Sequence, residues 1–92
     1  MSAWFAPYRW DDDPTMLALR KRIHRAHLMC LERAERAKCD EAGELFLLAM
    51  HIASSWLYQR TTEERLADAV ALLAYLWNAA DAIERLEAAD VD

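Results

Sequence analysis

Glycine, proline and β-branched residues are scarce in this 92-residue chain, which has one glycine and two prolines, both prolines within the first fourteen residues. Turns depend on glycine and proline, and strands are rich in valine and isoleucine. Valine occurs only at Val70 and Val91, whereas alanine, leucine, glutamate and arginine are abundant. Because these four are good helix formers, the composition predicts an all-α protein without strands.

Cysteines and long apolar runs are also few. Cys30 and Cys39 are nine residues apart, which puts them on opposite faces of one helix, so they cannot form a disulfide there. The sequence shows no run of about 18 apolar residues and no leader with a cleavage site. We therefore expect a cytoplasmic protein without a membrane span.

The apolar spacing predicts three helices, at about 14–39, 44–59 and 62–89, in a single domain of residues 1–92. Asp13 before Pro14 is typical of a helix start, because the carboxylate accepts from the free amides and proline loses nothing at the first helical position. Thr61 and Glu64 have the spacing of a capping box, which predicts the start of the third helix.

Gly43 is the signal for the first connection. The apolar stripe of the first helix loses its phase near this glycine, so we expect the chain to turn between residues 38 and 44. A single bent helix through this region is the alternative. Short connections favour antiparallel neighbours, and the predicted architecture is a small antiparallel three-helix bundle.

The apolar content exceeds what such a small bundle can bury. Hydrophobic residues make up 55% of the chain, above the roughly 45 to 50% of ordinary domains, and the second helix is apolar nearly all round. We therefore expect a homodimer. Residues 1–13 form an N-terminal arm dense in aromatic residues, which we expect to anchor on the helices or on a partner: Trp4, Phe5, Tyr8 and Trp10.

Charge is segregated along the chain, whose net charge is -5. Residues 14–39 carry seven basic and two acidic side chains, whereas residues 40–92 carry three basic and eleven acidic ones. In one interpretation, neighbouring helices simply neutralise each other at their rims. In the other, an acidic face of the third helix binds a basic surface on a protein partner. That face comprises Asp68, Asp81, Glu84 and Glu87.

Basic residues of the first helix offer a nucleic-acid alternative. Arg20, Lys21, Arg22 and Arg25 are clustered, and each phosphate contact would make binding dependent on salt. No turn places a recognition helix, and the chain as a whole is acidic. We therefore rank a protein partner above a nucleic acid.

Metal and catalytic patterns are weak. His24, His27 and Cys30 are three residues apart, but Cys30 lies about 120° from His24 around a helix, and His51 would have to complete a site from the second helix. Serines and cysteines lack a glycine-rich elbow, and one glycine cannot build a phosphate loop. We expect no metal, cofactor, small-molecule substrate or catalytic residue.

One enzyme family offers an alternative. The stretch from Leu17 to Ile23, LALRKRI, resembles the opening of the first helix in the small all-helical chorismate mutases. The resemblance covers seven residues and implies that Arg20 binds a dicarboxylate substrate. It ends at His24, where the family has an acidic residue, and the second helix lacks the family's later cationic and acid or glutamine positions.

The function that this sequence favours is a non-enzymatic helical interaction module. Such a module would be a small regulator or inhibitor of the antitoxin, anti-activator or phage- or plasmid-encoded type, and it would act by covering a surface on a macromolecule. An enzyme similar to chorismate mutase and a nucleic-acid-binding protein are the alternatives.

Overall fold

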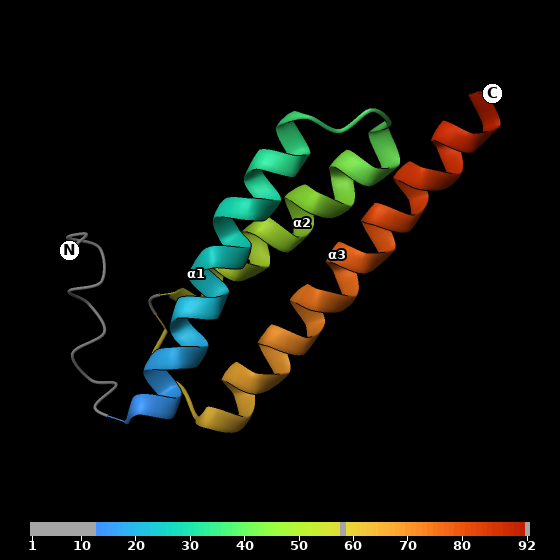
Figure 1. Ribbon diagram of the computed structural model, residues 1–92. Coiled ribbons are helices and arrows are strands. Elements are labelled where there is room, and N and C mark those ends of the chain that lie inside the picture. Colours follow the sequence, from blue (N-terminus) through green and yellow to red (C-terminus); the bar gives the residue numbers. More distant parts are fainter. Residues whose placement is uncertain (1–12, 58, 92) are drawn as a thin grey trace.

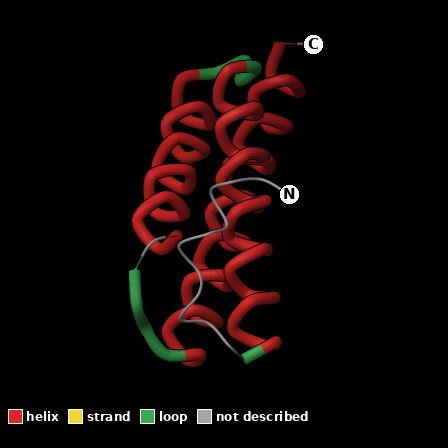
Figure 2. The backbone as a smooth tube through the Cα atoms, turned by 90° about the vertical axis from the view of Figure 1, so that its left-hand side faces the viewer, coloured by secondary structure: helices red, strands yellow, loops and turns green. Residues whose placement is uncertain are grey.

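Three helices make up the computed structural model, which describes residues 13–57 and 59–91. Helix α1 spans Pro14–Glu35, α2 spans Asp40–Leu57 and α3 spans Glu63–Val91. The helices run up, down and up in an elongated bundle of 51 × 25 × 16 Å (Figure 1). The two connections lie at opposite ends of the bundle (Figure 2). The all-helical prediction is confirmed, and no strand occurs in the described ranges.

Helix α1 begins where the sequence predicts. Asp13 is extended, and its Oδ1 accepts a hydrogen bond of 3.1 Å from the Thr15 amide. The helix ends at Glu35 rather than near residue 39. The Arg36 amide shares its bond between the carbonyls of Glu32 and Arg33, both at 3.2 Å, and the Ala37 amide bonds to the Ala34 carbonyl three residues back at 3.3 Å, so the α-helical pattern stops there.

Gly43 does not form the first connection, and this prediction was wrong. Helix α2 starts at Asp40, and Gly43 lies inside its first turn with its amide bonded to the Cys39 carbonyl at 3.1 Å. A Cβ atom built on Gly43 would be 3.3 Å from the Ala37 Cβ. The glycine therefore allows the connecting segment to approach α2 closely. The first turn of α2 is instead favoured by Asp40 and Glu41, whose carboxylates face the positive end of the helix dipole.

The predicted capping box is displaced by one residue. The Oγ1 of Thr62, not of Thr61, accepts from an amide three residues on, that of Arg65, at 3.3 Å, and the Thr62 carbonyl accepts from the Leu66 amide at 3.1 Å. The position that would reach back to the cap is therefore Arg65 rather than Glu64. The Oγ1 of Thr61 is buried and has no hydrogen-bond partner in the described chain.

Small residues on α2 hold the bundle together. The buried face of α2 alternates alanine with two large residues, Phe46 and Leu57, and packs between α1 and α3. Alanines let helix backbones approach closely, so few large side chains fill this core. The opposite face is uncovered: Leu47 is 41% exposed and Leu48 is 48% exposed. In the single chain, the apolar surface of α2 is therefore only half buried.

Candidate functional site

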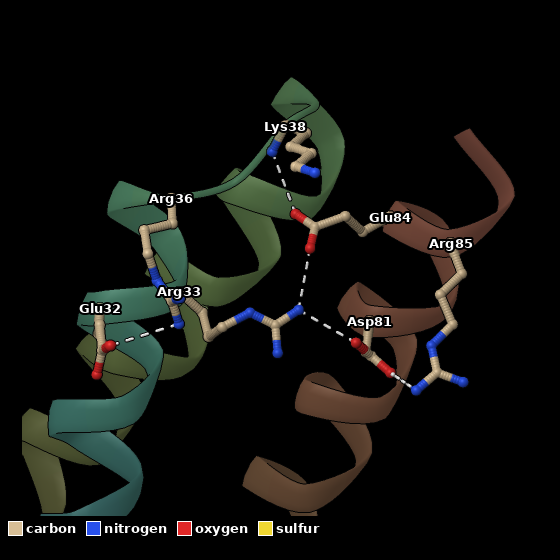
Figure 3. Close-up of polar contacts among 7 residues, drawn as sticks. All are labelled: Glu32, Arg33, Arg36, Lys38, Asp81, Glu84 and Arg85. Carbon is tan, nitrogen blue, oxygen red and sulfur yellow. Dashed lines mark hydrogen bonds and ion pairs between the residues drawn. The ribbon is translucent and has the colours of Figure 1, made fainter. Parts of the chain in front are cut away.

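Arg33 joins all three helices at one end of the bundle (Figure 3). Its guanidinium extends from α1 and donates to the Asp81 Oδ1 at 3.1 Å and to the Glu84 Oε1 at 3.0 Å, both on α3. The same group lies 4.7 Å from the ring centre of Phe46 on α2 and 5.0 Å from that of Trp77 on α3. Two ion pairs and two cation–π contacts therefore converge on one side chain, which is 22% exposed.

The first connection is attached to this cluster through Glu84. The second oxygen of Glu84, Oε2, accepts a hydrogen bond of 3.2 Å from the Lys38 amide. That bond, followed by those from Arg33, holds the pKa of the Glu84 carboxyl below its ordinary value. Asp81 makes a further ion pair, because its Oδ2 lies 3.0 Å from the Nη2 of Arg85. The carboxylates of Asp81 and Glu84 therefore make their ion pairs within the bundle.

The predicted acidic binding face is therefore interrupted. Asp68 and Glu87 are exposed, but Asp81 and Glu84 turn towards Arg33 and are partly buried. The structure thus brings two of the four residues together for an internal contact, as in the interpretation in which helices neutralise each other. The role of the four in partner binding stays a prediction. The predicted aromatic anchors lie outside the described residues: Trp4, Phe5, Tyr8 and Trp10.

Arg20 is fully buried at the end of α2. Its Nη1 donates to the Trp56 carbonyl and its Nη2 to the Gln59 carbonyl. The last carbonyls of a helix lack partners within the helix and carry partial negative charge, so a guanidinium is well suited to cap them. The substrate-binding role that the enzyme resemblance implies for Arg20, and the phosphate role, both require an accessible guanidinium.

The histidines of α1 lie near His51 of α2 without forming a metal site. Burial first, and then the neighbouring histidine, lowers the pKa of His24 and of His27; the neighbour is His27 in the first case and His51 in the second. Residues 13–57 and 59–91 contain no group of three potential metal-ligating side chains. The rings of His24 and His27 therefore lie where positive charge is disfavoured.

Cys30 and Ser55 also lack an activated arrangement. Cys30 is buried, and burial raises the pKa of its thiol, so the thiol stays protonated at neutral pH. Ser55 donates its hydroxyl to the Ile52 carbonyl at 2.7 Å, as serines within helices commonly do. Neither residue resembles a prepared nucleophile.

An open groove of about 370 Å³ lies between α1 and α3. Its walls and floor are mostly apolar and include Met29, Val70 and Leu73, while Arg22 and Arg25 stand exposed along the α1 side. Trp77 lines the groove at the end nearest the Arg33 cluster. Phe46 meets Trp77 edge to face, with ring centres 5.1 Å apart at 70°. Because Phe46 and Arg33 hold the indole, this wall of the groove is fixed before any partner arrives.

The outer face of α3 is uncharged along its middle. Between Asp68 and Asp81 the helix has no ionisable side chain other than Tyr75, which is 69% exposed, and Leu72 is 44% exposed. By length and composition alone, α3 could cross a membrane, although one such helix does not make a membrane protein and α3 buries its other face in the bundle. From the sequence we had expected no segment that could cross a membrane. The middle of α3 is therefore less polar than the acidic face that we predicted for this helix.

Comparisons with known protein families, with curated proteins and with solved structures found no match for this chain. The function must therefore be inferred from the chain itself.

We did not predict from the sequence that Arg20 and Arg33 make contacts inside the bundle. A signal for them existed. Arg20 lies four residues after Met16 and three before Ile23, and Arg33 lies three after Cys30, so both follow the apolar stripe of the first helix. A charged residue in register with a buried stripe predicts a buried, partnered group.

Proposed function

We propose that this protein is a non-catalytic helical interaction module, of the small regulator or inhibitor type, that binds a protein segment in the groove between α1 and α3. One observation carries this proposal: the groove has an apolar floor with a fixed indole and a rim of two exposed arginines, Arg22 and Arg25. Such a surface fits a segment that offers a large apolar or aromatic side chain beside carboxylates.

The lining of the groove favours binding over catalysis. An active site gathers several ionisable groups with shifted pKa values around a reacting atom. Here the only lining group with nucleophilic chemistry is Cys30, whose thiol is kept neutral by burial, and no acid or base lines the groove beside it. The groove is also open to solvent, which suits a peptide side chain better than a reaction that must exclude water.

Peptide selection tests the proposal. Random twelve-residue peptides are displayed and selected on the immobilised full chain. We expect enrichment of Trp, Phe or Leu with Asp or Glu within three residues. The variant with Arg22→Glu and Arg25→Glu should lose these peptides by at least tenfold in affinity. A matched control with Lys21→Glu and Arg36→Glu changes the same charge outside the groove and should retain them.

The contrary outcomes are equally clear. Absence of enrichment, or equal loss in both double variants, rejects the groove as a recognition site. A synthetic peptide of residues 1–13, which carries four aromatic residues and three aspartates, is included as a competitor. If that peptide displaces every selected sequence at lower concentration, the chain's own segment is the occupant and an external partner is rejected at this groove. If single-stranded nucleic acid binds and the groove variant abolishes this binding, the arginines serve phosphates.

A further inference from the structure

The outer face of α3 is an unpartnered apolar surface among the described residues. Its centre is a set of exposed positions that step by three or four residues and so lie along one side of the helix. They are Glu64, Ala67, Ala71, Ala74, Asn78, Ala82 and Arg85. Two large apolar side chains flank this line, Tyr75 at 69% exposure and Leu86 at 67% exposure. Water contacts this surface in the single chain, which is unfavourable for so much apolar area.

The charges on this face are arranged with opposite sign at its two ends. Glu64 stands at the N-terminal end and Arg85, which also pairs with Asp81 of the same helix, at the C-terminal end. The exposed Asp68 flanks the line one turn from Glu64, and the positions of the line between Glu64 and Arg85 carry no charge. In a parallel pair of such helices, glutamate would meet glutamate and arginine would meet arginine. In an antiparallel pair, each glutamate meets an arginine, and this occurs twice because of the two-fold symmetry.

We propose that the outer face of α3 binds the same face of a second copy of this chain, as an antiparallel helix pair. In this register Glu64 lies opposite Arg85 of the second copy, Ala67 opposite its Ala82, and Ala71 opposite its Asn78. The two-fold axis passes between Ala74 and Tyr75. The small side chains permit a close approach of the two backbones, and the tyrosines cover the centre of the contact.

The size of the face sets the strength of the dimer. From Glu64 to Arg85 the helix is about 32 Å long at 1.5 Å per residue, which gives a contact of roughly 450 Å² on each chain. The total of roughly 900 Å² falls in the range of weak, transient interfaces, so we expect a reversible dimer that dissociates on dilution. This contact borders the groove, because Ala74 lines both, whereas the groove rim of Arg22 and Arg25 lies on α1. Peptides are therefore selected on chain dilute enough to be monomeric, so that dimerisation and peptide binding are tested separately. The inference extends the proposed interaction module by adding a second surface to it.

Single cysteines test the antiparallel arrangement, in a background with Cys30→Ala and Cys39→Ser. Ala74→Cys places the thiols beside the axis, and we expect efficient disulfide cross-linking under mild oxidation. Ala67→Cys and Ala82→Cys should each fail alone but cross-link when the two chains are mixed. Cross-linking of Ala67→Cys with itself would reveal a parallel pair and overturn the proposal.

Charge reversal gives the independent measurement. Sedimentation of the full chain should show reversible dimerisation, and either Glu64→Arg or Arg85→Glu should raise the dissociation constant about five- to tenfold. The double variant with both changes should restore the original value, since the pair is re-formed with reversed sign. Reduced affinity without restoration overturns the register.

Two further results separate this inference from others. A monomer at all concentrations that binds to vesicles of anionic phospholipid would assign the face to a membrane and overturn the dimer. A dimer that selects no peptides in its groove leaves this inference intact and rejects the proposed function. A monomer that still selects peptides does the reverse.

Discussion

Replacing Arg20 by methionine removes a buried guanidinium while nearly keeping its volume. The substitution leaves the Trp56 and Gln59 carbonyls, at the end of α2, without the donors that now reach them from α1. An unsatisfied buried carbonyl costs about 1 to 3 kcal/mol. Removal of the buried charge regains part of this cost, because a guanidinium in the interior gives up its hydration.

The net loss should therefore be about 2 to 4 kcal/mol in the free energy of unfolding. A domain of this size has a total of about 5 to 10 kcal/mol, so the loss is a large fraction of its stability. Urea unfolding followed by circular dichroism measures this loss. With a slope near 1 to 1.5 kcal/mol per molar urea, the midpoint should fall by roughly 2 M.

Two matched variants sharpen this prediction. Arg25→Met removes an exposed arginine of the same helix and should change stability by less than about 0.5 kcal/mol. Arg20→Lys keeps the charge but cannot span two carbonyls as a guanidinium does, so its loss should be intermediate. If Arg20→Met unfolds at the same urea concentration as the original chain, the capping role is refuted.

Three further predictions follow from the same contacts. Because their pKa values are lowered from 6.5 in the folded chain, His24 and His27 bind fewer protons there than in the unfolded chain. The stability that they support is present above pH 6.5 and is lost as the pH falls through their folded pKa values. Urea midpoints measured between pH 7.5 and 5.5 should therefore fall with falling pH. A variant with glutamine at both positions should lose most of this pH dependence. Thr62→Ala removes the cap of α3 and should cost about 1 kcal/mol in thermal unfolding, and an unchanged transition would contradict the assignment of the cap. Arg33→Met should lower the free energy of unfolding by about 1 to 2 kcal/mol in chemical unfolding. Arg36 forms only an exposed ion pair with Glu32 of the same helix, so Arg36→Met should cost less than about 0.5 kcal/mol. Equal effects of the two substitutions would argue against the Arg33 cluster.

Helix class and the start of α1 could be predicted from the sequence because their causes act within one turn. Asp13 and Pro14 fix the start of α1 through a side chain and its nearest amides, and the structure shows this bond. The scarcity of glycine and of β-branched residues similarly excludes most alternatives to helix. The error at Thr61 was only one residue, because two adjacent threonines offer the same hydroxyl and only the packed helix selects between them.

Long-range partners were decided by the tertiary structure alone. Arg20 meets a carbonyl 36 residues away, and Arg33 meets a carboxylate 48 residues away. The register of Arg20 and Arg33 with the apolar stripe indicates that they are buried, but it does not name their partners, because the identity of the partner depends on how the helices are rotated against one another. For the same reason Asp81 and Glu84 resembled a free acidic surface in the sequence, and Gly43 resembled a turn when it serves close packing.

The sequence by itself determined that this chain folds into three helices. The tertiary structure decided which charges face inward and which face of α3 remains uncovered. The physical reason is that helix formation depends on neighbours along the chain, whereas the pairing of charges and the exposure of a face depend on geometry that arises only when helices pack.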